Sequence, residues 1–176
     1  MEATQHIKQE EQATLHTAFR RLHSTARAAP FPSWEVRLGW LRTLERLLEE
    51  NSAALIQAVC HDFVHRSREE TQMAELFPLR EGIRYAKQQL RSWMRPQKRR
   101  VSHWFWPAQN RVFPQPLGIV GIVVPWNYPI YLALGPLTTA LAAGNRVMIK
   151  MSEDTPYTGE VLQRLAQQYF GSELLV

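Results

Sequence analysis

Residues 117 to 153 constrain the fold of this chain more than any other stretch. The stretch opens with Leu117 to Val124, an apolar run rich in β-branched residues that is typical of a strand buried on both faces of a parallel sheet. After the turn from Pro125 to Pro129 the apolar spacing becomes helical, and Gly144-Asn145 is expected to end that helix in a left-handed conformation. The residues at helical spacing are Ile130, Leu134, Leu137 and Leu141.

A second strand and a second helix follow directly. Arg146 to Lys150 has the pattern of a short strand, and Ser152 to Pro156 contains the polar and proline signals that begin a helix. The order strand, helix, strand, helix predicts a right-handed crossover in a parallel sheet. Because ligands bind beyond the carboxyl ends of the strands in such sheets, the turn from Pro125 to Pro129 and the loop from Lys150 to Glu153 are the predicted edges of a site.

Helical patterns dominate the remainder of the chain. An amphipathic helix is expected from about Gln5 to Ala29, a second begins after the cap residue Ser33, and Asn51-Ser52 is expected to open a third. Near the other end, Thr155 to Phe170 predicts a further helix, and Leu174 to Val176 has the pattern of a third strand.

A long helix and a hairpin are predicted between these parts. Ser67 to Glu70 has capping-box spacing and begins a helix from about Glu69 to Trp93, which Pro78 is expected to kink. Val101 to Trp106 and Arg111 to Phe113 then predict the two strands of a hairpin.

Several motifs on consecutive elements resemble the aldehyde dehydrogenase superfamily. The motifs are Pro125-Trp126-Asn127, Leu141 to Asn145 and Lys150 to Pro156. Upstream, Asp62-Phe63, Arg66 to Thr71 and Phe77 to Tyr85 resemble the coniferyl-aldehyde-dehydrogenase-like branch of that superfamily. The resemblance covers nearly the whole chain and implies an N-terminal fragment, since 176 residues are under half of a usual member.

The resemblance implies an α/β fold, with N-terminal helices followed by a hairpin and the first βα units of an incomplete, Rossmann-like cofactor domain. Residues 1–100 would be the helical part of that domain, 101–116 a bridging hairpin, and 117–176 the first βα units of the NAD-binding domain. The hairpin contributes to an oligomerisation sheet in the family, so a homo-oligomer is expected for the full-length enzyme.

Asn127 is the predicted catalytic residue. Oxidation of an aldehyde to a carboxylic acid through a thioester needs a thiolate, donors for the oxyanion, a hydride acceptor and a base. The Asn127 carboxamide follows a strand, lies between two prolines and can donate to developing negative charge. The resemblance implies that it forms the side-chain half of the oxyanion hole. Judged without the resemblance, an asparagine here would more simply brace its own turn.

Lys150 and Glu153 are the predicted cofactor-binding pair. An ammonium can donate to ribose hydroxyls and a carboxylate can accept from them, and the resemblance implies that this pair binds the adenosine ribose. Glu153 would repel a 2′-phosphate, which favours NAD over NADP. Physical grounds alone equally allow a snorkelling lysine and a glutamate at a helix start. Met151 stands where the family has a proline, which relaxes the backbone there. The same resemblance adds Val124, Pro125 and Trp126 to the cleft lining.

Parts of the expected chemistry have no counterpart in the sequence. There is no G-x-G-x-x-G loop. The resemblance implies that the nicotinamide loop, the general-base Glu and the nucleophilic Cys lie beyond Val176, so this polypeptide is not expected to turn over an aldehyde by itself. A non-catalytic nucleotide-binding or oligomerisation relic is the second hypothesis.

The chain's one cysteine lies in a group that could suggest a metal site. The group is Cys60, His61, Asp62 and His65. Histidines four residues apart share a helix face, but no further Cys or Glu occurs at ligand spacing. We therefore expect a small buried thiol beside a frayed helix end, and no metal.

Two other classes of partner are not expected. The stretch from Val112 to Asn145 lacks charge and is long enough for a membrane span, but its prolines and glycines favour a buried strand and helix. The basic residues of Arg95 to Arg100 precede Trp104 to Trp106, a combination that could bind single-stranded nucleic acid, although a solvated helix end explains it better. The net charge of +5 bears on association with other molecules and says little about the fold. A single cysteine is typical of a cytoplasmic protein.

Overall fold

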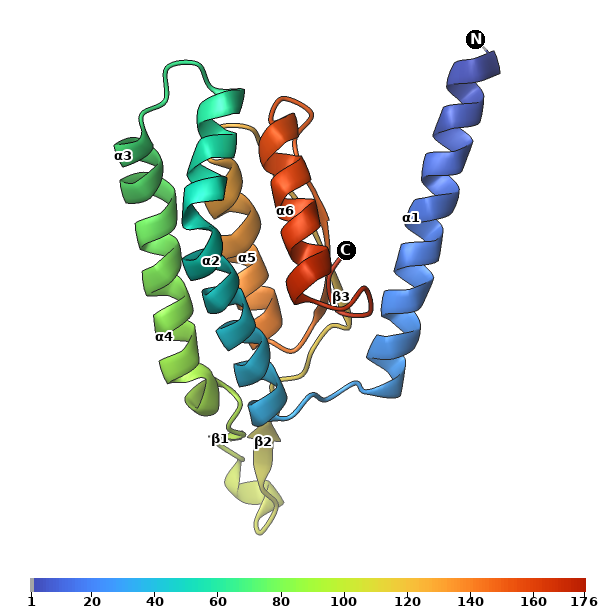
Figure 1. The fold of residues 1–176 in the computed structure, drawn as a ribbon. Coiled ribbons are helices and arrows are strands. Elements are labelled where there is room, and N and C mark those ends of the chain that lie inside the picture. The colour runs from blue at the N-terminus through green and yellow to red at the C-terminus, as the bar shows by residue number, and fades with distance from the viewer. Residues whose placement is uncertain (1) are drawn as a thin grey trace.

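The structure is a computed structural model that describes the backbone of residues 2–176 and the side chains of residues 12–176. One helix packs on each side of a small parallel sheet, and the other long helices lie together on one of those sides (Figure 1). In chain order the elements are α1 (Glu2–Ala28), α2 (Trp34–Asp62), α3 (Arg68–Thr71), the π-helical turn η1 (Gln72–Leu76), α4 (Phe77–Trp93), β1 (Gln97–Arg99), the 3-10 turn η2 (His103–Phe105), β2 (Asn110–Val112), β3 (Ile119–Val123), α5 (Pro129–Ala142), β4 (Arg146–Lys150) and α6 (Pro156–Tyr169).

The parallel sheet has the predicted order. β3 pairs with β4 in parallel, from Ile119 opposite Arg146 to Val123 opposite Lys150. The last residues of the chain extend the sheet beyond β4, since Leu175 forms a parallel bridge to Val147. The predicted alternation of strands and helices, including the start of a third strand, is therefore confirmed.

The prediction that Leu117 to Val124 is buried on both faces was wrong. Ile122 is the one buried residue within β3, and the side chain of Val123 is 80% exposed. β3 has β4 along one edge, while no strand of the described residues pairs with its other edge. Burial depends on the neighbouring elements, so an apolar run indicates a strand without fixing how much of it is covered.

α2 is one continuous helix, and the expected start of a third helix at Asn51-Ser52 was wrong. Ser33 caps α2 as predicted, because its hydroxyl accepts from the backbone N–H of Val36 at 3.4 Å. The side chain of Asn51 donates to the carbonyl of Leu47 at 2.9 Å, so its polar group is satisfied inside the helix and no new cap is needed.

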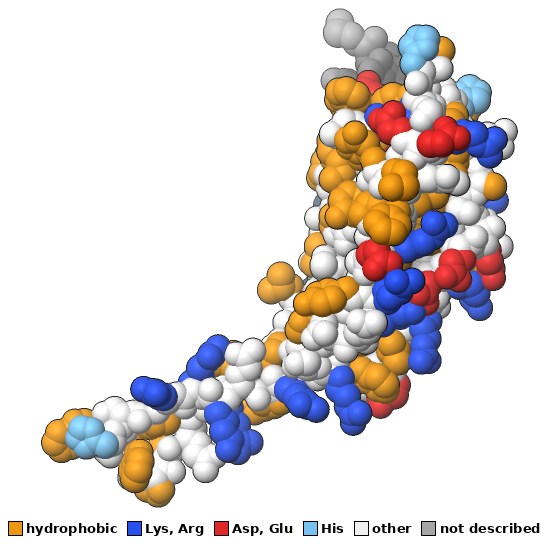
Figure 2. Space-filling view, turned by 90° about the vertical axis from the view of Figure 1, so that its left-hand side faces the viewer, with side chains coloured by type: hydrophobic (Ala, Val, Ile, Leu, Met, Phe, Trp, Pro, Cys, Tyr) orange, Lys and Arg blue, Asp and Glu red, His pale blue; other side chains and the backbone are white. Residues whose placement is uncertain are grey.

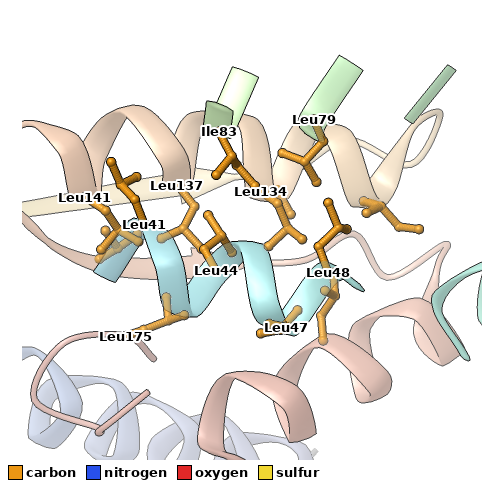
Figure 3. Packing of buried hydrophobic residues seen from close by; sticks show 14 of the residues in the cluster. Leu41, Leu44, Leu47, Leu48, Leu79, Ile83, Leu134, Leu137, Leu141 and Leu175 are labelled. Carbon is orange, nitrogen blue, oxygen red and sulfur yellow. The ribbon is translucent and has the colours of Figure 1, made fainter. Parts of the chain in front are cut away.

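Leucines of α2 form the centre of the core. Figure 3 shows them meeting side chains from α4, from α5 and from the end of the chain. Each fully buried leucine contributes about 1.5–3 kcal/mol relative to an exposed one. The residues labelled there are Leu41, Leu44, Leu47, Leu48, Leu79, Ile83, Leu134, Leu137, Leu141 and Leu175. The apolar spacing predicted for α5 is therefore confirmed as its buried face.

The long predicted helix runs from α3 to α4 through the π-helical turn η1. Its cap is confirmed, because the Ser67 hydroxyl accepts from the N–H of Glu70 at 3.0 Å. The irregularity expected at Pro78 occurs just before it: the N–H of Phe77 reaches back to the carbonyl of Gln72. Proline has no N–H for the carbonyl four residues earlier, and a wider turn upstream accommodates that missing donor.

The hairpin is present, but its first strand was predicted in the wrong place. β1 (Gln97–Arg99) pairs antiparallel with β2, and residues 101–106 form the connection that contains η2. The hairpin projects from the helical body, with hydrophobic side chains at its far end and Lys and Arg along its sides (Figure 2). Trp104 is 82% exposed there. Strand propensity reflects packing against neighbours, and these aromatic residues have little to pack against within the chain.

The expected N-terminal helix is confirmed as α1. Leu22 and Ala26 of its predicted apolar stripe are buried, while Leu15 and Phe19 are exposed. The part of the chain that the structure describes contains no helix with both the length and the apolar composition of a membrane span.

Candidate functional site

The two loops predicted to edge a site begin side by side. The N–H of Val124 donates to the carbonyl of Lys150 at 2.9 Å, which continues the β3–β4 ladder to the carboxyl ends of both strands. From that point one loop leads into α5 and the other into α6. The structure therefore brings the turn from 125 to 129 and the loop from 150 to 153 to one edge of the sheet.

Asn127 lies in the first loop with its side chain exposed. Among the residues whose side chains are described, its carboxamide has no hydrogen-bond partner, so it does not brace its own turn. Of the other residues predicted in this loop, Val124 is buried, whereas Pro125 and Trp126 are exposed. The Trp126 ring lies 6.2 Å from the ring of Phe63. The amide donor is thus available to a molecule that binds at this edge.

Arg66 holds the main chain beneath that carboxamide. Its Nη1 donates to the carbonyl oxygen of Asn127 at 2.7 Å. Its guanidinium also lies 4.3 Å from the ring centre of Phe63 and 4.9 Å from that of Tyr128. A planar cation between two rings is well suited to fix a carbonyl in direction as well as in distance.

Glu75 closes the other end of the same turn. Its side chain is 0% exposed, and its Oε2 accepts from the N–H groups of Ile130 at 2.7 Å and Tyr131 at 3.0 Å. These donors lie in the first turn of α5, whose own cap residue, Tyr128, makes no side-chain cap. A carboxylate at a helix N-terminus satisfies free N–H groups and is favoured by the helix dipole.

Arg66 and Glu75 also contact each other. Nη1 of Arg66 lies 3.8 Å from Oε1 of Glu75, and that oxygen has no hydrogen bond within the described part of the chain. Burial raises the pKa of Glu75, against the two backbone N–H groups and the Arg66 charge, which lower it.

Asp62 performs the equivalent capping role for the second loop. Its carboxylate accepts from the N–H of Tyr157 at 3.0 Å and from the N–H and hydroxyl of Thr158 at 2.8 and 2.6 Å. The cap residue of α6 itself, Thr155, makes no side-chain cap. Asp62 therefore holds the start of α6 from the end of α2.

The possible metal ligands near Asp62 have other contacts. The His61 ring packs on the Tyr157 ring with centroids 3.6 Å apart, and the Cys60 thiol donates to the carbonyl of Arg66 at 3.6 Å. No group of three or more His, Cys, Asp or Glu side chains in the described residues is arranged to hold a metal ion.

Lys150 and Glu153 form an ion pair with each other at the rim. Their side chains are largely exposed, and Lys150 Nζ also donates to the carbonyl of Met151 at 3.0 Å. The hydrogen bond from Lys150 holds the pKa of Glu153 below its ordinary value. Both side chains therefore face solvent, where they can exchange their mutual contact for hydroxyl groups of a ligand.

Sequence reasoning missed Arg66 and Glu75 as parts of this site. Glu75 did carry a signal, because it lies four residues before Leu79 on the buried stripe of a helix, where an unpaired carboxylate is rarely found. Arg66 carried none, since a loop arginine before a helix is ordinary on a protein surface.

A model of the aldehyde dehydrogenase family matches residues 2–172. The chain belongs to the aldehyde dehydrogenase family. A probable coniferyl aldehyde dehydrogenase of Pseudomonas aeruginosa is 48% identical over 162 residues, which make up 92% of this chain and 34% of that protein. The chain thus spans about a third of the length of the curated relatives that it matches.

Solved aldehyde dehydrogenases share the fold. Staphylococcus aureus AldH in a substrate-bound state aligns with a TM-score of 0.88 at 24% identity, over 92% of this chain and 35% of that one. A Streptococcus pyogenes succinic semialdehyde dehydrogenase in complex with NADP+ aligns with a TM-score of 0.79 at 16% identity, over 92% of this chain and 34% of that one. The predicted α/β fold class, with helices and a hairpin before the first βα units, is confirmed. At these identities the likeness concerns the fold alone.

Proposed function

We propose that this aldehyde dehydrogenase chain supplies the oxyanion donor and one rim of the cofactor cleft in an enzyme that oxidises an aldehyde to a carboxylic acid. The observation that carries the proposal is the unpaired carboxamide of Asn127 at the carboxyl end of β3. A preorganised N–H donor aimed at developing negative charge is worth about a hundredfold or more in turnover.

The cofactor proposal rests on Lys150 and Glu153. Both are exposed beside the end of β4, and their charges suit the hydroxyls of a ribose: Lys150 would donate and Glu153 would accept. NAD or NADP, the cofactors of this family, would accept the hydride. We infer a preference for NAD, because the Glu153 carboxylate would repel a 2′-phosphate. Val124, Pro125 and Trp126 would line the same cleft.

Other parts of the enzyme would come from outside these residues. The one thiol, Cys60, donates to the Arg66 carbonyl at the end of α2, so we infer that another polypeptide segment supplies the nucleophile and that residues 1–176 do not turn over an aldehyde alone. Residues 1–100 would support the cofactor domain, residues 117–176 would begin it, and the hairpin within 101–116 would join copies of the full-length enzyme. The names of the relatives suggest an aromatic aldehyde of the coniferyl type as the substrate.

The cofactor proposal is tested by titrating the ¹⁵N-labelled chain with NAD and with NADP. NAD should shift the backbone amide signals of Lys150 and Glu153 at lower concentration than NADP. Glu153→Gln should bring the NAD and NADP concentrations needed for this shift closer together, because it removes the charge that opposes the 2′-phosphate. Equal responses of the wild-type chain to both cofactors would reject the preference, and no response to either would reject the cleft.

The oxyanion proposal is tested in an active enzyme that contains this chain. Asn127→Ala should lower kcat by about a hundredfold or more. Asn127→Asp should do no better, since it replaces an N–H donor by an acceptor. Normal turnover of both variants would reject Asn127 as the oxyanion donor. The second candidate is a non-catalytic nucleotide-binding or oligomerisation relic. That candidate is motivated by the exposed aromatic end of the hairpin and predicts saturable binding without NADH formation.

A further inference from the structure

The turn that carries Asn127 has no side-chain cap of its own. Its last residue, Tyr128, makes no cap for α5, and the Asn127 carboxamide makes no hydrogen bond within the described side chains. The position from which that carboxamide extends therefore depends on the main chain of the turn. Whatever fixes the main chain also fixes the Cα–Cβ bond that carries the donor.

One ion pair reaches both ends of this turn. Arg66 holds the carbonyl of Asn127 at 2.7 Å, and Glu75 holds the N–H groups of Ile130 and Tyr131 at 2.7 and 3.0 Å. The pair itself is closed by the 3.8 Å contact between Arg66 Nη1 and Glu75 Oε1. Side chains from outside the βα unit thus span the segment from residue 127 to residue 131.

The pair is shielded from solvent. Glu75 is wholly buried, and the Arg66 side chain is 12% exposed between the rings of Phe63 and Tyr128. Ion pairs in such surroundings are screened little by salt, and loss of one partner leaves the other buried and uncompensated. Arg66 also lies 3.6 Å from Glu70, which is half exposed and offers a weaker second partner.

We propose that Arg66 and Glu75 are positioning residues that hold the main chain of the turn, and with it the point from which the Asn127 carboxamide extends. The inference rests on the proposed function, because it gives Asn127 the role of oxyanion donor. Neither Arg66 nor Glu75 touches the reacting atoms. They act through the main chain of the turn, and a small misplacement of a donor can cost up to about a hundredfold in rate.

The first test measures the motion of the backbone at Asn127 in this chain. The ¹⁵N order parameter of its backbone N–H group is compared in wild type, Arg66→Gln and Arg66→Lys. Glutamine removes the cation and should lower the order parameter markedly. Lysine keeps the charge without the planar fork, so the order parameter of Arg66→Lys should lie between those of wild type and Arg66→Gln. The lysine variant remains informative if the glutamine variant does not fold. Unchanged order parameters in both variants would overturn the proposal.

The matched control is Arg84→Gln. Arg84 also forms an ion pair, at 2.7 Å with Glu81, but both partners are exposed on α4. Its loss should leave the Asn127 signal unchanged. A response as large as that of Arg66→Gln would mean that loss of any such ion pair loosens the turn, which would overturn the specific role of Arg66.

The second test separates positioning from general stability in an active enzyme that contains this chain. Arg66→Gln should lower kcat by about ten- to a hundredfold with little change in KM, and it should have no further effect when Asn127 is already alanine. Full additivity of the two substitutions would overturn the positioning role. If Asn127→Ala alone leaves kcat normal, the proposed function fails. If Asn127→Ala is slow while Arg66→Gln is normal, only the present inference fails.

Discussion

The loops after β3 and after β4 both lead into a helix that lacks a local cap, and the carboxylates that complete the two helix starts differ in burial. Each leads into a helix whose first residue is proline, and neither helix is capped by the residue before it. In each case a carboxylate from an earlier helix accepts from two successive backbone N–H groups in the first helical turn. Glu75 of η1 does so for α5, and Asp62 at the end of α2 does so for α6. A helix start without a local cap can therefore be completed by a residue far away in the sequence.

The two caps differ in what surrounds them. Glu75 is fully buried and contacts Arg66, whereas Asp62 is half-buried and has no ion-pair partner among the described side chains. The site residues differ in the same sense. Asn127 lies on a turn that is held from inside, while Lys150 and Glu153 are exposed and contact each other. The main chain of the first loop is held by buried side chains, and the charged groups of the second face solvent.

The largest effect is expected when the buried cap is removed. Glu75→Ala would leave the N–H groups of Ile130 and Tyr131 without an acceptor and would leave Arg66 without its buried partner. The free energy of unfolding should fall by about 3 kcal/mol, measured by urea denaturation. Glu160→Ala is the control, since Glu160 is an exposed carboxylate on α6. A loss as small as that of the control would show that Glu75 does not stabilise the start of α5.

A smaller loss is expected for the half-buried cap. Asp62→Ala removes the acceptor for Tyr157 and Thr158; Tyr157 is exposed, so water can reach its freed N–H, whereas Thr158 is buried. The free energy of unfolding should fall by about 1 kcal/mol in the same urea experiment, which is the usual value of a helix cap. If this loss equals that of Glu75→Ala, burial does not distinguish the two loops.

The buried cap should give the stability a pH dependence of its own. Because burial raises the pKa of Glu75 in the folded state, the folded chain keeps its proton to higher pH than the unfolded chain does. The contribution of Glu75 to stability is therefore fully present below the unfolded pKa of about 4.3 and is lost as pH rises through the folded pKa. Glu75→Gln keeps an acceptor oxygen but cannot ionise, so it should lack this decline. Parallel pH profiles for wild type and Glu75→Gln, measured by urea unfolding, would contradict the shift.

The smallest effect is expected at the exposed pair. Lys150 stabilises the charged form of Glu153 through their hydrogen bond, yet both groups are solvated. Glu153→Gln should leave the urea midpoint unchanged, because exposed ion pairs contribute little to stability. The same substitution should still alter the response to NAD and NADP. A clear drop in the midpoint would show that this loop is also held by its site residues.

Much of the architecture was predictable from local patterns. The helical spacing of Ile130 and Leu134, the cap at Ser67 and the short strand from Arg146 to Lys150 each depend on neighbouring residues only, and each is present as expected. The strand order followed from the alternation of strands and helices. The motif around Asn127 indicated the family, and the family model confirms it.

What the sequence determined by itself was the type and order of the elements and the family, because periodicity, caps and motifs are written within a few consecutive residues. Tertiary structure alone decided which carboxylate caps which helix, how much of β3 is covered and where the hairpin strands pair. Those outcomes depend on contacts between residues that are far apart in the chain, such as Glu75 and Ile130. Local spacing carries no information about such distances, so only the folded chain could show that Arg66 and Glu75 hold the main chain on either side of Tyr128.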